Sequence, residues 1–288
     1  MSAPSPLFRF VQLELPWQLG PPDGRYLLRP PDDPQAPATH VVVFATLGAP
    51  ERRRLAQLRR QREAAPGPEP TPVSTGRATV VDVGRPLADL RDAGEWLEQA
   101  GETDLDRGIE VLNRTLHAFR VVTADPYQNA VSRSQAIVAR IGFGAGEQVA
   151  DGLWTDAREL VHAEGRQRRA RVLTPQVRLA AVLGARDRPL VCEELALRAR
   201  LDLDHGRERE AALQVLVTLD AALAELPSEP EAAALADRLT ELRGQREPVA
   251  IAAQAALAGP LGDAELESVA FTLQRIEAAL RARAVERA

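Results

Sequence analysis

Three glycines near the middle of the chain could form the turn of a phosphate-binding loop. Gly142, Gly144 and Gly146 lie in IVARIGFGAGEQVADGLW, residues 137–154. A dinucleotide-binding loop consists of a strand, a glycine turn and a helix, so that free backbone N–H groups of the helix meet the phosphates. Here Glu147 follows the turn, and its carboxylate would repel an anion. We therefore predict a β-hairpin formed by IVARIGFG and EQVADGLW, and a ligand bound at the glycines is the alternative.

Two Gly-x-Pro sequences are the next turns with the chemistry to hold an anion. Gly48-Ala49-Pro50 and Gly84-Arg85-Pro86 each follow an apolar run, and proline is favoured in the first turn of a helix. A helix N-terminus beside an arginine binds carboxylate or phosphate groups. We interpret both sequences as strand-to-helix junctions. Gly84 and Arg85 join the three glycines as residues that would line the site of an enzyme for a phosphorylated or carboxylated small molecule.

Arginine is concentrated in two short segments. They contain Arg52, Arg53, Arg54, Arg59, Arg60 and Arg62 in the first, and Arg166, Arg168, Arg169 and Arg171 in the second. Such clusters bind nucleic-acid phosphates. Neither cluster is interleaved with aromatic residues that would stack on bases, and the net charge of -5 repels a polyanion from the molecule as a whole. Solvent-exposed helix faces are the favoured interpretation, with nucleic-acid or polyanion binding as the alternative.

The composition removes several classes of reaction. All 36 basic residues are arginine, so the chain has no lysine for a Walker A loop or a Schiff base. The single cysteine, Cys192, lies in a helical pattern and is expected to be a buried structural thiol. The four histidines are scattered, and His117 is expected to be solvated. Because no zinc-hydrolase or nucleophile motif occurs, we expect no catalytic residue, metal or cofactor.

The first half of the chain has the pattern of a sheet with helices. Short runs rich in valine, leucine and phenylalanine predict four strands. These strands cover 7–15, 25–29, 40–47 and 77–83. The run at 40–47 is apolar on both faces, which predicts a strand inside the sheet. A helix with Thr103 as its N-cap is expected to end at Asp125-Pro126 and to bury an apolar stripe. The stripe consists of Leu105, Ile109, Leu112, Leu116 and Phe119.

From about residue 153 the pattern becomes helical throughout. Two leucine-rich stripes recur at helical spacing and indicate packed helices. They are Leu216, Leu219, Leu223 and Leu226, and then Leu266, Val269, Leu273, Ile276 and Leu280. Glycine and proline separate the helical runs, for example at Gly206 and Pro227. The best candidate for a membrane span, at 248–262, is too short and is interrupted by glycine and proline.

These patterns predict an α+β N-terminal domain followed by an all-α helical-hairpin domain. The first covers 1–152, with a small mixed sheet and a Pro-rich exposed loop near 64–76, and the second covers 153–288. The absence of a secretory pattern at the N-terminus predicts a cytoplasmic location, and the composition is typical of a GC-rich bacterial genome. Many amphipathic helices without a reactive set favour a non-catalytic scaffold or adaptor, whose helical half binds a protein partner or a second copy of the chain.

Overall fold

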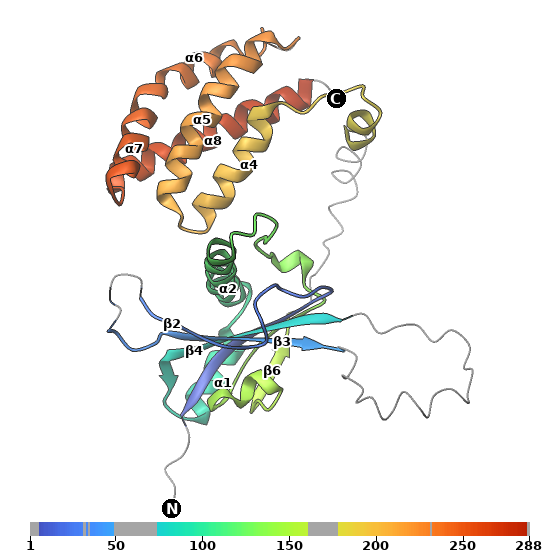
Figure 1. Cartoon of the computed structure of the whole chain (residues 1–288), viewed down its shortest axis with the longest axis vertical. Coiled ribbons are helices and arrows are strands. Elements are labelled where there is room, and N and C mark those ends of the chain that lie inside the picture. Colours follow the sequence, from blue (N-terminus) through green and yellow to red (C-terminus); the bar gives the residue numbers. More distant parts are fainter. Residues whose placement is uncertain are drawn as a thin grey trace, which may run out of the picture. The chain divides into compact units, whose positions relative to one another are not determined.

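The chain divides into two compact units, Met1–Ala163 and Glu164–Ala288. The computed structural model describes residues 6–30, 33, 35–48, 74–160, 178–230 and 232–286. The first unit contains a β-sheet and helices, and the second is built of helices (Figure 1). The mixed α+β class that the sequence predicts is therefore confirmed.

Six strands of the described residues form one antiparallel sheet in the order β2-β3-β4-β1-β5-β6. They are β1 (Leu7–Leu15), β2 (Gly24–Leu28), β3 (His40–Leu47), β4 (Thr75–Leu87), β5 (Val138–Ala145) and β6 (Asp156–Glu159). The four predicted strands are present, and β3 lies inside the sheet. The prediction of a mixed sheet was wrong. Because β1 lies between β4 and β5, the two strands that the helices connect are not neighbours, and every neighbouring pair is antiparallel.

The larger core of the first unit lies between the sheet and two helices, α1 (Leu90–Gln99) and α2 (Glu102–Thr123). Val11 of β1, Val42 of β3 and Val80 of β4 lie on this face of the sheet, since side chains alternate along a strand. They belong to one cluster with the predicted stripe of α2. Its buried members are Leu105, Ile109, Leu112 and Leu116, and Phe119 is half-buried. The stripe that the sequence predicts is thus confirmed.

Helix α1 (Leu90–Gln99) begins after a capping aspartate. The side chain of Asp89 accepts hydrogen bonds from the backbone N–H groups of Arg91 and Asp92, each at 2.9 Å. Such a cap satisfies N–H groups that have no partner within the helix. The expected helix start at Pro86 was wrong, because Pro86 still belongs to β4.

Helix α2 (Glu102–Thr123) begins two residues before the position that the sequence indicates. Gly101 is the N-cap, and the carboxylate of Asp104 accepts a hydrogen bond from the backbone N–H of Gly101 at 2.9 Å. The prediction of Thr103 as the N-cap was therefore wrong. The helix ends at Thr123, and its C-cap, Ala124, has a φ of 52°, in the left-handed region.

The opposite face of the sheet is covered by a short 3₁₀ segment, η2 (Gly146–Asp151). Val149 and Ala150 of η2 form a second cluster with Phe10 and other sheet residues, and the ring of Trp154 lies 5.7 Å from that of Phe10. The predicted hairpin was wrong in its second strand, because EQVADG forms the 3₁₀ segment η2, which packs on the sheet instead of pairing with β5. Strand β6, which does pair with β5, begins only at Asp156, within the stretch expected to be helical.

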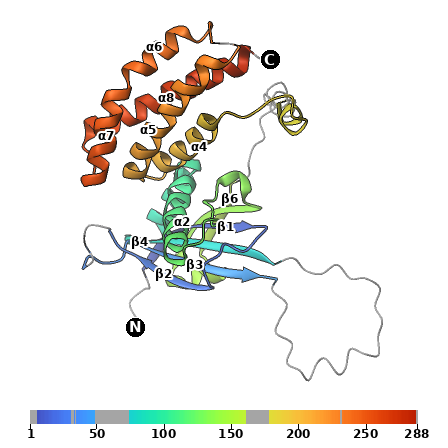
Figure 2. The ribbon, with the colours of Figure 1, turned by 45° about the horizontal axis from the view of Figure 1, so that its top comes forward.

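The second unit consists of helices around a core of alanine, valine and leucine. They are α4 (Val191–Asp204), α5 (Glu208–Glu225), the short η4 (Leu226–Ser228), α6 (Ala236–Gly244), α7 (Arg246–Ala258) and α8 (Asp263–Glu286). Helix α7 packs against both α5 and α8 (Figures 1 and 2). Residues of both predicted stripes, such as Leu219 and Leu273, are fully buried in this core.

One helix among the described residues is long and apolar enough to cross a membrane, the segment Glu208–Ser228 of α5 and η4. Its buried face, which includes Val215 and Leu219, forms part of the core of the second unit. Arg209 and Asp220 lie on the same helix and are not in that core. These features are typical of a central core helix, which passes the same test of length and composition.

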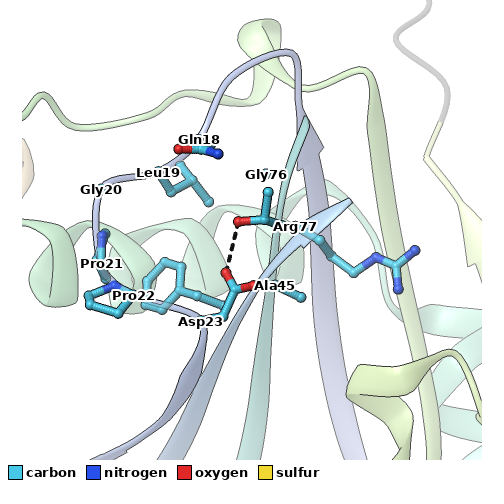
Figure 3. A pocket seen from close by; sticks show the side chains of 11 residues that line it. Gln18, Leu19, Gly20, Pro21, Pro22, Asp23, Ala45, Gly76 and Arg77 are labelled. Atoms are coloured by element: carbon cyan, nitrogen blue, oxygen red, sulfur yellow. Dashed lines mark hydrogen bonds between the residues drawn. The ribbon is translucent and has the colours of Figure 1, made fainter. Parts of the chain in front are cut away.

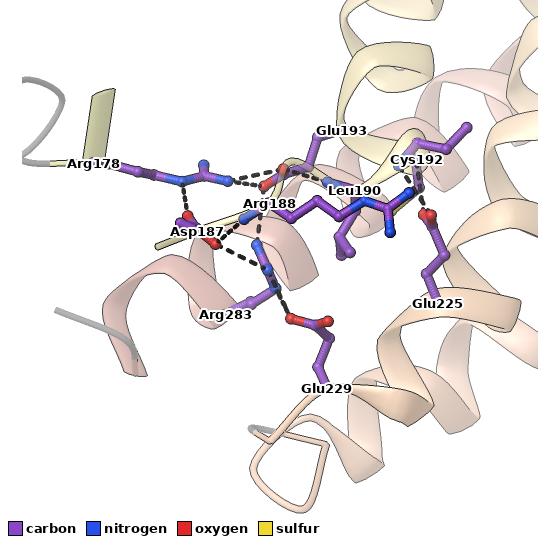
Figure 4. Close-up of polar contacts among 10 residues, drawn as sticks. Arg178, Asp187, Arg188, Leu190, Cys192, Glu193, Glu225, Glu229 and Arg283 are labelled. Atoms are coloured by element: carbon purple, nitrogen blue, oxygen red, sulfur yellow. Dashed lines mark hydrogen bonds and ion pairs between the residues drawn. The ribbon is translucent and has the colours of Figure 1, made fainter. Parts of the chain in front are cut away.

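A buried arginine joins the end of α8 to the start of α4 (Figure 4). Arg283 is only 1% exposed, and it lies 2.6 Å from Glu229, 3.2 Å from Glu193 and 4.0 Å from Asp187. Arg178 contacts two of the same carboxylates, at 3.1 Å for Asp187 and 2.7 Å for Glu193. The two arginines and three carboxylates thus form one network. It joins α4 and the residues before it, the residue that follows η4, and α8.

The single cysteine lies beside this network. Cys192 is buried, as the sequence predicts. Its backbone N–H and that of Val191 donate hydrogen bonds to the carboxylate of Glu225 at 2.9 and 3.0 Å, which caps α4. Burial, together with the nearby Glu225 carboxylate, raises the pKa of the Cys192 thiol to about 12. A thiol with so high a pKa is a poor nucleophile in the folded protein.

Candidate functional site

Three polar side chains form a row across the middle strands of the sheet. His40 of β3 lies opposite Asp82 of β4, and Asp82 lies opposite Arg9 of β1. Residues directly opposite in antiparallel strands point to the same face, with Cβ atoms about 5 Å apart. The row therefore places an imidazole, a carboxylate and a guanidinium next to one another, on the face that packs against α1 and α2.

A bulge in β4 brings Arg85 to this row. The pairing of β1 with β4 shifts between Leu7 and Arg9, and the extra residues of β4, 83–86, form the bulge. Nη1 of Arg9 donates a hydrogen bond to the carbonyl oxygen of Arg85 at 3.3 Å. Bulges re-aim side chains and are frequent next to functional sites. The predicted helix N-terminus at Gly84-Arg85-Pro86 is thus replaced by a bulge in the same residues.

Gly84 has a packing role within the bulge. Its N–H donates to the carbonyl oxygen of Thr39 at 2.9 Å, and the N–H of Val83 donates to the same oxygen at 3.0 Å. A Cβ on Gly84 would lie 3.3 Å from Cα of Thr39, which is tighter than most real contacts. The glycine therefore allows the bulge to lie close to the residue that precedes β3.

Helices α1 and α2 form the other wall of a cleft over the row. The guanidinium carbon of Arg9 lies 5.4 Å from the ring centroid of Trp96 on α1. The cleft has a volume of about 820 Å³, within the range of small-molecule sites. We call it the sheet–helix cleft. Its polar lining residues are Arg9, Thr39, His40, Asp82, Arg85, Asp104, Arg107 and Glu110.

Two arginines of the sheet–helix cleft have no carboxylate partner. Within the part of the chain that the structure describes, neither Arg9 nor Arg85 forms an ion pair, and the buried Nε of Arg9 has no acceptor. Arg107, by contrast, lies 3.9 Å from Asp104. A guanidinium presents a fork of N–H donors that matches carboxylate and phosphate oxygens. An anionic group in the cleft would supply an acceptor for Nε of Arg9 and a charge partner for both guanidinium groups.

Burial keeps His40 uncharged near neutral pH. The pKa of His40 lies below its ordinary value of 6.5, first because burial disfavours the imidazolium. Asp82 acts in the opposite direction, while Arg114 and Arg85 lower the pKa further. The imidazole Nδ1 lies 3.1 Å from the hydroxyl oxygen of Thr39. The row therefore contains a neutral hydrogen-bonding group, the imidazole of His40, next to the Asp82 carboxylate.

We expect the first unit to lose stability as the pH falls through the histidine range. Because the pKa of His40 is lower in the folded than in the unfolded chain, the unfolded chain binds more protons below pH 6.5. This part of the stability is present above pH 6.5 and is lost as the pH falls toward the pKa of the folded state. Urea unfolding followed by fluorescence of Trp17, Trp96 and Trp154 at about pH 7.5 and about pH 5.5 measures it. His40→Asn should flatten this dependence, and an unchanged slope would contradict the assignment.

The three glycines singled out in the sequence have packing and turn roles in β5 and η2. A Cβ on Gly142 would lie 2.4 Å from the carbonyl oxygen of Asp156, and one on Gly144 would lie 2.7 Å from Val149. Gly146 has a φ of +65° and begins η2. In these described residues a 3₁₀ segment follows the strand, so the α-helix N-terminus of a phosphate-binding loop is not formed there.

A smaller hollow of about 240 Å³ lies beside the loop of residues 18–23 (Figure 3). Its charged groups already have partners. Asp23 accepts a hydrogen bond from the hydroxyl of Thr46 at 2.9 Å, and Arg77 forms an ion pair with Glu14 at 3.1 Å. The Arg77 side chain also extends away from the loop in Figure 3. This hollow is therefore the weaker candidate for a ligand site.

The sequence identified only part of the sheet–helix cleft. Gly84 and Arg85 were candidates, but Arg9, His40 and Asp82 were not, because they meet only through strand pairing. Both arginine clusters lie outside the described residues, so nucleic-acid binding stays a prediction. A search of the described residues for three or more histidine, cysteine or acidic side chains placed to hold a metal ion finds none.

Searches against protein-family models, curated proteins and solved structures give no match to this chain.

Proposed function

We propose that the first unit binds a small carboxylated or phosphorylated molecule in the sheet–helix cleft. The observation that supports this most strongly is the pair Arg9 and Arg85, which line the cleft without a carboxylate partner in the described residues. Oxygens of an anion placed beside them would satisfy the buried Nε of Arg9, which is costly to leave without a partner, and would pair with the exposed guanidinium of Arg85. The volume of the cleft suits a metabolite-sized molecule.

The packing of α2 on β1 supports a preformed cleft. Gly108 of α2 lies so close to Val11 that a Cβ would be 2.6 Å from the valine side chain. Both residues line the cleft and are buried. A wall held by close backbone approach keeps its charged groups in place before the ligand arrives, which lowers the entropic cost of binding.

Calorimetric titration with succinate, malate, propyl phosphate and glycerol 3-phosphate tests this proposal. We expect at least one of these anions to bind, and Arg9→Gln or Arg85→Gln to weaken its binding about ten-fold or more, since a charge-assisted hydrogen bond contributes roughly 1.5–3 kcal/mol. The matched control is Arg91→Gln, because Arg91 is 87% exposed and pairs with Glu95 on the same helix as Trp96. Absence of binding by all four anions, or equal loss in the control, would overturn the proposal.

We also propose that the second unit packs as antiparallel helical hairpins that present a face to a second copy of the chain. Helices α4 and α5 contact each other, and each leaves two apolar side chains exposed four residues apart. Leu197 is 68% exposed and Leu201 41%, while Leu213 is 36% and Val217 is 55% exposed. Apolar pairs at this spacing lie on one side of a helix, where a partner helix can cover them.

Light scattering of the full chain tests this second proposal. We expect a dimer or larger species at micromolar protein concentration, and a monomer after Leu197→Asp combined with Val217→Asp, because a carboxylate in an apolar interface is strongly disfavoured. The control is Leu257→Asp on α7, a residue that is 61% exposed. A monomeric wild-type chain would contradict self-association.

A further inference from the structure

The hydrogen bonds around Thr39 can all form in one tautomer of neutral His40. The hydroxyl of Thr39 donates to the carbonyl oxygen of Leu28 at 3.3 Å. Nδ1 of His40 lies 3.1 Å from the same hydroxyl oxygen. A hydroxyl has only one proton, so a Thr39 hydroxyl that donates to Leu28 accepts from Nδ1–H of His40. In this tautomer neutral His40 has its lone pair on Nε2.

The lone pair of His40 Nε2 is available to a molecule in the cleft. In the described part of the chain Nε2 has no hydrogen-bond partner. It is accessible to solvent. His40 lines the sheet–helix cleft, next to the carboxylate of Asp82 in the same row. The row thus presents two acceptors, while Arg9 and Arg85 present donors.

A ligand that fits this row needs more than negative charge. Its anionic group would face Arg9 and Arg85, and a second group would have to donate a proton to His40 Nε2. An anion without such a donor would remove water from Nε2 and leave it without a partner, which costs binding free energy. Sites built to hydrogen-bond a hydroxyl discriminate strongly against analogues that lack it.

We propose that the ligand of the sheet–helix cleft is a hydroxylated carboxylate or phosphate ester, whose hydroxyl donates to Nε2 of His40. This inference rests on the proposed anion-binding function and adds the class of the ligand. Hydroxy acids and polyol phosphates share the required chemistry, an anionic group with a neighbouring hydroxyl donor. His40 is then the residue that determines specificity, and Arg9 and Arg85 provide most of the affinity.

Two pairs of probes that differ in hydroxyl groups test this inference with the full chain. Malate is compared with succinate, and glycerol 3-phosphate with propyl phosphate, by calorimetric titration near neutral pH. We expect the hydroxylated member of at least one pair to bind about ten-fold more tightly, which corresponds to one hydrogen bond of about 1.4 kcal/mol. The pair that discriminates shows whether the anionic group is a carboxylate or a phosphate.

Two variants of His40 separate specificity from folding. His40→Asn keeps an N–H that can reach Thr39 but removes the acceptor at Nε2, whereas His40→Gln can place an amide oxygen near that position. We expect His40→Asn to bring the two members of the discriminating pair to within about three-fold, while His40→Gln retains the preference. The affinity for the member without the hydroxyl should change little in either variant, which shows that the cleft is intact.

The outcomes distinguish the two proposals. Equal binding of both members of each pair by the wild-type chain overturns the hydroxyl inference and leaves anion binding in place. A hydroxyl preference that persists in His40→Asn also overturns it, because the donor would then face another acceptor such as Asp82. Tighter binding of aspartate than of malate would also overturn the hydroxyl inference, since the ammonium group of aspartate would then face the carboxylate of Asp82. No binding of any anion overturns both proposals.

Discussion

Replacing Arg283 by methionine is expected to lower the unfolding free energy of the second unit by about 3–5 kcal/mol. The side chain is 1% exposed, and the three carboxylates around it are 14–17% exposed. Methionine fills a similar space but leaves the carboxylates of Asp187, Glu193 and Glu229 with less compensating charge. Breaking a buried network by removing one partner costs more than the network contributes as a whole, because the remaining charges stay desolvated.

The single cysteine provides a probe for this experiment. Cys192 is buried in the second unit, so its reaction with a thiol reagent during a urea titration reports the unfolding of that unit. Arg281→Met is the matched control, since Arg281 lies on the same helix, is 66% exposed and contacts Glu277 only at 3.9 Å. The control should change the midpoint little. A loss for Arg283→Met within about 1 kcal/mol of the control would contradict the role assigned to the buried network.

Replacing Gly108 by valine is expected to destabilise the first unit by about 3 kcal/mol. A Cβ at this position would lie 2.6 Å from both Cβ and Cγ2 of Val11, so α2 would have to move away from β1. Gly94→Ala is the opposite case, because nothing lies within 4 Å of a Cβ there. Replacing that helical glycine by alanine should stabilise the unit by roughly 0.5–1 kcal/mol.

A compensating change tests whether the contact with Val11 is the cause. In the background Val11→Gly, which removes both the Cβ and the methyl groups that the new side chain would meet, the cost of Gly108→Val should fall by at least about 1 kcal/mol, since coupled neighbours depart from additivity by that order. Tryptophan fluorescence follows the unfolding, because Trp17, Trp96 and Trp154 all belong to the first unit. Equal costs in the two backgrounds would show that α2 does not depend on this approach.

Patterns among neighbouring residues in the sequence predicted the strands and helices better than they predicted the residues of the sheet–helix cleft. The strands β1 and β3 and the buried stripe of α2 follow from alternation and helical spacing, which depend on neighbours in sequence. The positions of helix starts depend on individual side-chain hydrogen bonds. Thr103 has the chemistry of an N-cap, but Gly101 takes that place because Asp104 bonds its N–H.

The cleft could not be predicted because its residues meet through long-range pairing. His40, Asp82 and Arg9 come from three strands, and the position of β1 between β4 and β5 brings them into one row. The bulge at Gly84 and Arg85 resembles a strand-to-helix turn in sequence, since both arrangements use glycine and proline. A one-residue change of register would place the same side chains on the other face of the sheet.

Nuclear magnetic resonance of the full chain, labelled with ¹⁵N and titrated with malate and glycerol 3-phosphate, tests the central claim most directly. Binding in the sheet–helix cleft predicts saturable shifts that are largest at the backbone amides of Arg9, Asp82 and Gly108 and at the indole N–H of Trp96. Shifts confined to the hollow at residues 18–23 or to α4–α8, or no saturable shift with either anion, would contradict it.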